Sequence, residues 1–189
     1  LARSRGLGDV YKRQRIFCEY RDQRSFPLLL PLLDQPCPVE RMSAVYALGR
    51  NPCPSAVQKL VSLLKTDDNA YVRRATAWSL ANYDNQIVLE PLINALKNDV
   101  AAVRLWSSSS LAEIGNVSFE NAQLAAEQLL ISLKIDNESG VRSNCIWSLC
   151  RLYEKLNNTF QESFVDECTK IALFDKEPSV MEEAKTALD

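Results

Sequence analysis

The sequence contains two near-copies of one phrase, which a single compact domain has no reason to repeat. "VRRATAWSL" spans 72–80 and "VRSNCIWSL" spans 141–149, and two of the three tryptophans occupy the same offset in them. An Arg lies seven residues before a Leu at four places along the chain, and Met181 holds the same position before Leu188 in a fifth. We call each such eight-residue stretch a frame. The five frames begin at intervals of 32, 31, 38 and 39 residues, at Arg41, Arg73, Arg104, Arg142 and Met181. Self-similarity at a nearly fixed period indicates a stacked repeat array.

Each repeat also has a first half with apolar residues at helical spacing. In "AVQKLVSLLK", the apolar residues fall at positions i, i+3, i+4 and i+7, beginning at Val57, which is typical of an amphipathic helix. A short polar break follows each such half, and the predicted caps of the second helices are Asp68, Asp99, Asn137 and Ser179. One helical hairpin cannot bury its apolar face alone. The pattern therefore predicts an all-α solenoid of about five hairpins and about ten helices, at 24–53, 54–85, 86–118, 119–158 and 159–189.

The first fourteen residues lack this pattern. They end in "DVYKRQ", which matches the translation of a sequencing-library adapter, so we expect segment 1–14 to be non-native and the array to be truncated. The chain has 22 Lys and Arg and 24 Asp and Glu, and four of these basic residues and one acidic residue lie in 1–14. The remainder, at a net charge of −5 and without a basic stripe, is a poor candidate for nucleic-acid binding.

No autonomous catalytic motif is visible. The sequence has no histidine, which excludes Ser-His and Cys-His catalysis and histidine-based metal sites within it. It contains neither GxGxxG nor GxxxxGK[ST], so no nucleotide loop is predicted. Six cysteines without a CxxC pair predict reduced thiols in a cytoplasmic protein, and no apolar run is long enough for a membrane span.

The order of an Asp, then Val-Arg, then small residues, then Ala/Ser-Leu resembles HEAT-like repeats over about residues 24–188. More narrowly, "VRRATAWSLANY" and "VRSNCIWSLCRL" resemble the short repeats of cyanobacterial phycobilin lyases, which serve the phycobilisome. This resemblance implies an α-solenoid that attaches linear tetrapyrroles to phycobiliproteins, or assists that step. The implied ligand is a phycobilin, and the implied partner is a phycobiliprotein or a second lyase subunit. The alternative is a protein–protein scaffold of the same fold without chemistry.

The tryptophans fall on one expected face of the second helices, since residues three and four apart share a helix face. The stripe that we expect to line the concave surface comprises Met42, Tyr46, Arg74, Trp78, Trp106, Asn144 and Trp147. An exposed aromatic row usually marks a binding surface. Trp78 could stack on a flat ligand while Arg74 pairs with its carboxylate. A wedge of the tryptophans between adjacent hairpins is an equally open interpretation.

The repeated arginines could be taken for a basic binding surface, but a structural ladder is the stronger interpretation. Acidic residues and backbone carbonyls of the neighbouring turns, such as Asp67, Asp68 and Asp99, are available as partners. Such a ladder fixes how hairpins stack, and its expected members are Arg41, Arg73, Arg104 and Arg142.

Overall fold

The computed structural model describes residues 22–84 and 86–189, so segment 1–14 lies outside the described residues. Within the described ranges all regular secondary structure is helical, with ten α-helices, five short 3-10 helices and no strand. The predicted all-α solenoid of HEAT-like hairpins is confirmed. The chain divides into an N-terminal unit, Leu1–Val88, and a C-terminal unit, Leu89–Asp189.

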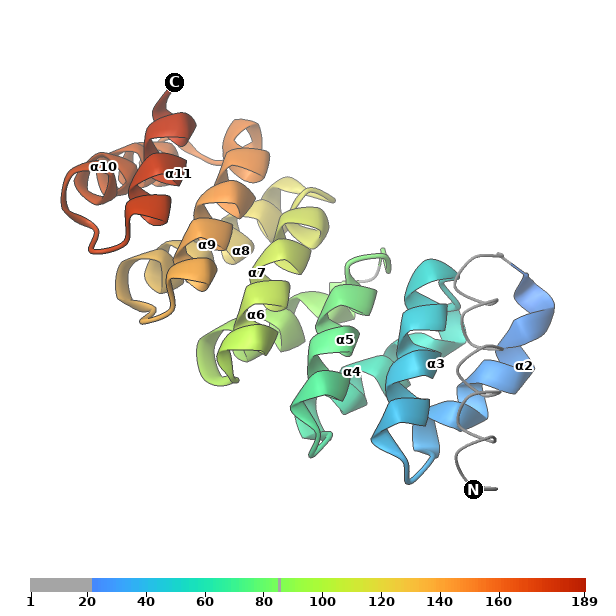
Figure 1. The fold of residues 1–189 in the computed structure, drawn as a ribbon. Helices are drawn as coiled ribbons and strands as arrows, with labels where there is room; N and C mark the ends of the chain where they lie inside the picture. Colours follow the sequence, from blue (N-terminus) through green and yellow to red (C-terminus); the bar gives the residue numbers. More distant parts are fainter. Residues whose placement is uncertain (1–21, 85) are drawn as a thin grey trace. The chain divides into compact units, whose positions relative to one another are not determined.

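The described part of the N-terminal unit contains a short helix that is broken near its start. Pro27 and Pro31 lack the N–H that continues a helix ladder, and here a four-residue α-helix is followed by the 3-10 segment Leu30–Asp34. The α-helices of this unit are α2 (Phe26–Leu29), α3 (Pro38–Arg50), α4 (Val57–Thr66) and α5 (Ala70–Leu80). Helix α3 packs on α5, and α4 packs behind α5 (Figure 1).

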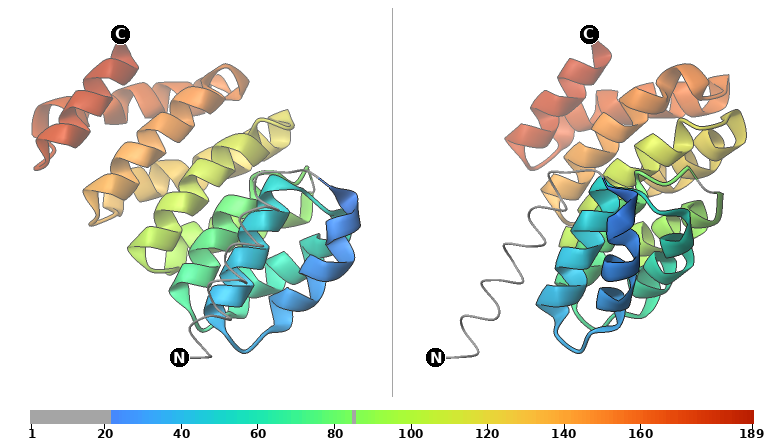
Figure 2. Two further views of the ribbon diagram at one scale, coloured as in Figure 1. Left: turned by 45° about the vertical axis from the view of Figure 1, so that its right-hand side comes forward. Right: turned by 90° about the vertical axis from the view of Figure 1, so that its right-hand side faces the viewer.

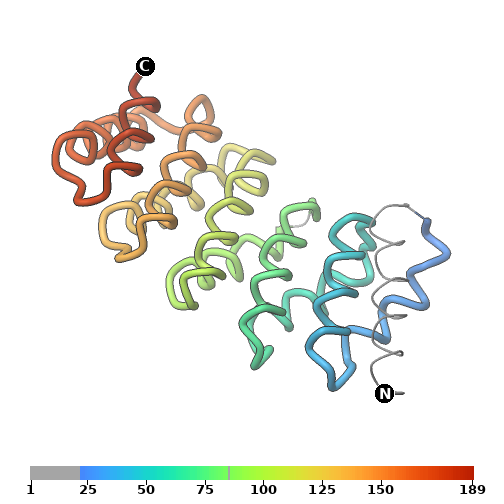
Figure 3. The backbone as a smooth tube through the Cα atoms, viewed as in Figure 1, coloured from blue at the N-terminus to red at the C-terminus, as the bar shows by residue number. Residues whose placement is uncertain are grey.

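The C-terminal unit consists of helices in two layers. Its elements are α6 (Leu89–Asn98), α7 (Ala101–Gly115), α8 (Phe119–Ile135), α9 (Ser139–Leu152), α10 (Asn158–Phe174) and α11 (Pro178–Leu188). The first helices of the hairpins, α6, α8 and α10, pack on one another in sequence, and so do the second helices α7, α9 and α11 (Figures 1 and 2). We call α7, α9 and α11 the second-helix layer of the C-terminal unit, and α6, α8 and α10 its first-helix layer. In the N-terminal unit, α3 and α5 form the second-helix layer, and α4 belongs to the first-helix layer. Short turns join the two helices of each hairpin (Figure 3).

The leucine that ends each frame lies in the core between the two layers. Four of these leucines are completely buried, namely Leu48, Leu80, Leu111 and Leu149, whereas Leu188 in the last helix is 41% exposed. The residue before each of the four is small and buried, which lets the backbones of neighbouring second helices approach closely. Helices α3 and α5 also pack tightly at Gly49, where an added Cβ would lie 2.6 Å from Cζ3 of Trp78.

The predicted helix caps are wrong by one or two residues. The observed cap of α5 is Asn69, whose side chain accepts hydrogen bonds from the Tyr71 and Val72 N–H groups at 3.0 and 3.4 Å. The residues that precede α7, α9 and α11 make no side-chain cap; they are Val100, Glu138 and Glu177. One aspartate in the turn before each of α5, α9 and α11 accepts a hydrogen bond from a backbone N–H of that turn; these are Asp67, Asp136 and Asp175. Each of these turn aspartates also pairs with an arginine of the preceding hairpin.

Candidate binding surface

Paired arginines and aspartates join successive hairpins in the C-terminal unit. Arg142 donates from Nε and Nη2 to the two carboxylate oxygens of Asp175, at 3.0 and 2.7 Å. Arg104 makes the same two-pronged contact with Asp136, at 2.7 and 2.8 Å. The Nη1 group of Arg142 also donates to the Asp136 carbonyl at 2.9 Å. Each arginine therefore binds the turn that begins its own helix and the turn of the next hairpin.

The N-terminal unit contains the same arrangement. Arg41 donates to both carboxylate oxygens of Asp67, at 2.7 and 2.8 Å, and contacts Asp68 at 3.2 Å. Its Nη1 group donates to the Gln35 carbonyl at 2.8 Å. Arg73 donates to the Asp67 carbonyl at 2.8 Å. These contacts place the repeated arginines at the joints between hairpins.

The ladder aspartates, which we define as Asp67, Asp136 and Asp175, are held ionised by this pairing. Burial acts to raise the pKa of each carboxyl, but hydrogen bonds from the partner guanidinium and from a backbone N–H outweigh it. The net result is a pKa below the ordinary Asp value for all three. A buried carboxylate with its acceptor sites filled is a structural group and is poorly placed to meet an outside ligand.

Two of the three tryptophans lie at the surface of the C-terminal unit. Trp106 of α7 is 36% exposed, and Trp147 of α9 is 40% exposed. The guanidinium of Arg151 lies over the Trp147 ring at 5.0 Å from its centroid, and it also pairs with Glu113 at 2.8 Å. The wedge interpretation requires indoles that are sealed between hairpins. These two indoles are not sealed in this way.

A shallow hollow lies beside Trp147. We call it the α7–α11 hollow; it has a volume of about 310 Å³ and is lined by Ser109, Gly140, Ser143, Asn144, Trp147 and Glu183. Trp106 precedes Ser109 by three residues, so it lies along the same face of α7. The Nδ2 group of Asn144 donates to the Leu105 carbonyl and to the Ser109 hydroxyl at 3.0 and 2.6 Å. Asn144 therefore braces α9 against α7, and its amide donor is already engaged.

In the N-terminal unit, α3 and α5 bring together a group that we call the arginine–aromatic cluster: Tyr46, Arg50, Tyr71, Arg74 and Trp78. The Tyr46 and Trp78 rings are 5.3 Å apart and tilted by 54°. Arg50 lies over Trp78 at 5.3 Å, and Arg74 lies over Tyr71 at 5.5 Å. The Nη2 group of Arg74 donates to the Tyr46 hydroxyl at 3.4 Å.

Trp78 is only half-buried although it packs closely against α3 at Gly49. Met42, the remaining member of the predicted stripe, is also half-buried on α3. The sequence singled out three of the five cluster residues by stripe position, namely Tyr46, Arg74 and Trp78, but it missed Arg50 and Tyr71. The contact of Arg50 with Trp78 depends on the pairing of α3 with α5, which the spacing of one helix does not reveal. Tyr71 lies three residues before Arg74 on the same helix, so helix spacing alone could have found it.

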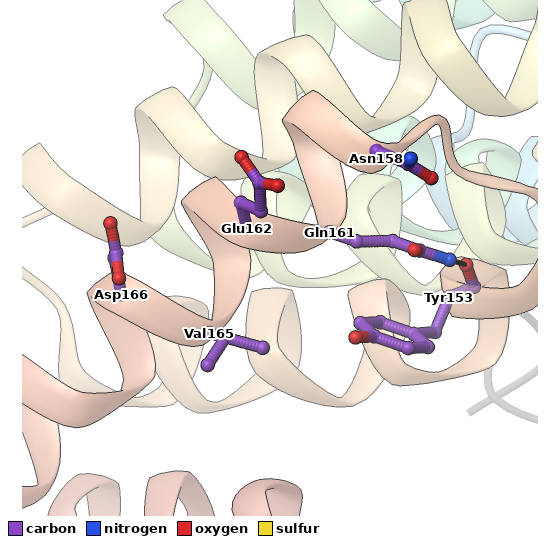
Figure 4. Close-up of a pocket in the computed structure, with 6 residues that line it drawn as sticks. All are labelled: Tyr153, Asn158, Gln161, Glu162, Val165 and Asp166. Atoms are coloured by element: carbon purple, nitrogen blue, oxygen red, sulfur yellow. Dashed lines mark hydrogen bonds between the residues drawn. The ribbon is translucent and has the colours of Figure 1, made fainter.

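A second hollow of the C-terminal unit was not anticipated from the sequence. It has a volume of about 270 Å³ and is lined by Tyr153, Asn158, Gln161, Glu162, Val165 and Asp166. Figure 4 shows the Glu162 and Asp166 carboxylates on one side of α10, away from Val165. The Gln161 amide is occupied, since it donates to the Tyr153 carbonyl at 2.8 Å. Because almost all of its wall comes from one helix, this hollow offers a ligand little enclosure.

Acidic and cysteine side chains are the remaining candidates for a metal site or a nucleophile. Across 22–84 and 86–189 no group of three or more His, Cys, Asp or Glu side chains is arranged to hold a metal ion. Burial raises the pKa of the Cys145 thiol and raises that of Cys168 to about 12, so both stay protonated and are weak nucleophiles. No helix in the described part of the chain is both long and apolar enough to cross a membrane.

Comparison with known proteins agrees with this architecture. The family model for HEAT repeats matches residues 14–81 and 57–150. The complex of CpcE and CpcF of phycocyanin lyase from Nostoc sp. PCC7120 contains a similar chain, with a TM-score of 0.69 and 23% identity over 89% of this chain and 100% of that one. A designed armadillo repeat protein in complex with the peptide (KR)4 matches with a TM-score of 0.67 and 20% identity, over 94% and 90% of the two chains.

Another computationally designed armadillo repeat protein, made for modular peptide recognition, matches with a TM-score of 0.66 and 20% identity over 95% and 90% of the two chains. No curated protein matches the sequence. At these identities the likeness to solved structures concerns the fold. It places the chain among repeat proteins built from stacked helical hairpins.

Proposed function

Because the chain belongs to the HEAT repeat family, we propose that it is a binding subunit that holds a protein partner along its second-helix layers. The observation that carries this proposal is the exposure of Trp106 and Trp147 on α7 and α9. Large aromatic side chains left in water beside a hollow are typical of a contact surface.

The two indoles can contribute a substantial part of the binding energy for a partner. A large aromatic side chain can bury about 150–250 Å², and each indole exposes about two fifths of its surface. Covering that remainder removes roughly 60–100 Å² from water, which contributes about 2 kcal/mol per ring. Two such rings are comparable to a pair of interface hot spots.

The form of the surface favours an extended segment of a protein. The α7–α11 hollow crosses three successive second helices, is shallow, and is lined mostly by small or polar side chains. The designed armadillo neighbours include one solved with a bound peptide and one made for peptide recognition. A peptide that crosses the layer contacts every repeat, whereas a compact small molecule is enclosed only by a deeper pocket.

A peptide-display selection tests this proposal. The purified protein is used to select binders from a library of random twelve-residue peptides, and their affinities are measured for the native protein and for the double variant Trp106→Ala, Trp147→Ala. We expect the double variant to bind at least tenfold more weakly, because about 1.4 kcal/mol corresponds to a tenfold change.

The matched control is Phe174→Ala. This ring is 81% exposed, but it lies at the end of α10 in the first-helix layer of the same unit. Its removal should leave the affinities unchanged. Selected peptides that bind the double tryptophan variant as tightly as the native protein would contradict the proposal, provided that circular dichroism shows both proteins equally helical.

A more specific candidate is a phycobilin lyase subunit or a bilin-handling chaperone. It is favoured by the neighbour from the phycocyanin lyase complex, all of whose chain is covered by this one. The chemistry of the arginine–aromatic cluster suits a linear tetrapyrrole, because flat rings can stack on its conjugated body and guanidiniums can pair with its propionates. In this role the protein would hold the tetrapyrrole extended near a thiol of the partner phycobiliprotein, and catalysis would come from positioning.

Mixing the protein with phycocyanobilin, with and without an apo-phycobiliprotein, tests the lyase candidate. A shifted absorbance band that weakens in Trp78→Ala and Arg74→Gln is expected. If no band appears under either condition, the lyase candidate is wrong, and the peptide-binding proposal is judged by its own selection experiment.

A further inference from the structure

The arginines of the arginine–aromatic cluster differ from the ladder arginines in having no carboxylate partner within 22–84 and 86–189. Arg41, Arg104 and Arg142 each pair with a ladder aspartate. Among the residues that the structure describes, no ion pair involves Arg50 or Arg74, although both are held in place by aromatic rings. From this contrast we infer that the cluster is a recognition site for an acidic segment of the protein partner; the inference rests on the proposed function and specifies the partner's chemistry.

Hydrogen bonding supports this inference independently of charge. The Nε group of Arg74 is buried and has no hydrogen-bond partner in the described part of the chain, and its Nη2 group makes only a long contact of 3.4 Å to the Tyr46 hydroxyl. A buried donor without an acceptor is costly. Of the Arg74 donors only Nε is buried without a partner, so a carboxylate from outside would bind at the Nη1 and Nη2 edge, where a guanidinium can form two parallel hydrogen bonds.

The rings prepare both cations for such an encounter. Arg74 lies over Tyr71 and Arg50 lies over Trp78, so one planar face of each guanidinium is covered by an aromatic ring. Stacking of this kind leaves the N–H groups at the edge of the guanidinium free to donate. Because the arginines are already ordered, little side-chain entropy is lost when a carboxylate binds.

The spacing of the cluster fits an extended peptide. Arg74 and Trp78 are four residues apart on α5, which is about 6 Å along the helix axis, and Arg50 lies on Trp78. Alternate side chains of an extended strand point to the same side and recur every 6.6 Å or so. Acidic residues at positions i and i+2 of a partner segment therefore recur at about the spacing of Arg74 and Trp78 along α5.

A nucleic acid fits this surface less well. The chain has a formal net charge of −2, and the cluster contains two cations only, whereas nucleic-acid binding is typically driven by many phosphate contacts. The aromatic–cationic pairs instead suit a short segment in which acidic residues alternate with neutral ones.

Fluorescence anisotropy with defined peptides tests the inference. The probe is fluorescein-labelled (Glu-Thr)4, and the charge-reversed peptide (Lys-Thr)4 is its counterpart; both are titrated with the whole chain at constant salt. The native protein should bind (Glu-Thr)4 and not (Lys-Thr)4. The double variant Arg50→Gln, Arg74→Gln should bind (Glu-Thr)4 at least tenfold more weakly, since charge-assisted hydrogen bonds are among the strongest that an interface makes.

The matched control is Lys65→Gln, which removes an exposed cation from α4 in the first-helix layer of the same unit. It should change the affinity for (Glu-Thr)4 by less than about twofold, because its distance from the bound peptide leaves only a screened charge effect. Circular dichroism of the variants shows whether they keep the native helicity.

The inference is overturned if the native protein does not bind (Glu-Thr)4, or if the double arginine variant binds it as tightly as the native protein does. It is also overturned if Lys65→Gln loses as much affinity as the double arginine variant. A fourth contrary result is displacement of the labelled peptide by single-stranded RNA at a lower concentration than by unlabelled peptide. If phycocyanobilin binding depends on the two arginines and (Glu-Thr)4 binding does not, the cluster is a tetrapyrrole site and the inference is likewise wrong. In each case, library peptides that still require Trp106 and Trp147 would leave the proposed function intact.

Discussion

Replacing Arg142 by Gln should destabilise the C-terminal unit more than any exposed charge change in it. The Arg142 and Asp175 side chains are 6% and 8% exposed. The substitution removes both hydrogen bonds to the carboxylate and the two that Arg142 donates to the Asp136 and Asn137 carbonyls. Loss of one partner of a buried ion pair costs about 3–5 kcal/mol, because the other charge is left without compensation.

The chain provides a matched control in the same helix. Arg151 of α9 pairs with Glu113 of α7 at 2.8 Å, but the two side chains are 42% and 44% exposed. An exposed ion pair contributes about 0–1 kcal/mol. Arg151→Gln therefore removes the same type of side chain at nearly the same place in the fold and should lower the free energy of unfolding by less than about 1 kcal/mol.

Urea denaturation measures both variants. Circular dichroism follows the whole chain, and tryptophan fluorescence is weighted towards the C-terminal unit, which contains Trp106 and Trp147. We expect the fluorescence transition of Arg142→Gln to move to clearly lower urea than that of Arg151→Gln. Equal shifts in the two variants would refute the view that the repeated arginines are the joints of the array. Combining Arg142→Met with Asp175→Leu should recover much of the lost stability, because no charge then remains unpaired.

Three further predictions concern stability. Gly49→Ala should lower the free energy of unfolding by about 1–3 kcal/mol in thermal denaturation, because the new Cβ would lie 2.6 Å from the Trp78 ring. Gly140→Ala is the control: its Cβ would meet the nearest atom at 3.5 Å, so the change should be neutral or stabilising by up to about 1 kcal/mol. Tyr83→Phe should cost about 1–2 kcal/mol in urea denaturation, since the buried hydroxyl donates to the Leu48 carbonyl and accepts from the Cys53 N–H. Burial also raises the pKa of Tyr83 to about 12, so ultraviolet absorbance should show a tyrosine ionisation in this high pH range that is missing in Tyr83→Phe. The ladder aspartates have lowered pKa values in the folded protein. The stability that they contribute is therefore present above the unfolded Asp pKa of about 3.9 and is lost as the pH falls through the folded pKa values. Urea midpoints that stay constant from pH 7 to pH 2 would contradict this.

Much of the fold follows from local periodicity. The apolar spacing of each hairpin is set by the helix repeat, so the buried positions of Leu48, Leu80, Leu111 and Leu149 could be predicted without knowledge of their neighbours. The break between α2 and the 3-10 segment also has a local cause, because Pro31 at this junction lacks the N–H that would continue the backbone ladder.

The candidate surface was less predictable, because it depends on how neighbouring helices rotate. Ser43 and Ala75 occupy the same frame position as Trp106, yet both are buried and Trp106 is exposed. Asn144, at that position in the next repeat, holds α9 to α7. The repeat pattern assigns all these residues to the same face of their helices. Whether a given residue on that face is buried depends on the neighbouring helix that packs against it.

The turn aspartates illustrate the same limit at the helix starts. The sequence places Asp67 and Asp68 side by side, and it predicts Asp68 as the cap of α5, whereas Asn69 is the cap. Only contact with Arg41 of the preceding hairpin distinguishes them: the Asp67 side chain is 2% exposed in this pair, and that of Asp68 is 93% exposed. The choice is made by a residue about 26 positions away along the chain.

Hydroxyl-radical footprinting of the protein with and without a library-selected peptide most directly tests whether the second-helix layer is the binding surface. Saturating peptide should slow the oxidation of Trp106 and Trp147 several-fold, while Phe174 in the first-helix layer should be oxidised at the same rate as in the free protein. Protection of Phe174 with unchanged oxidation of both tryptophans would place the partner on the opposite layer and contradict the proposed function.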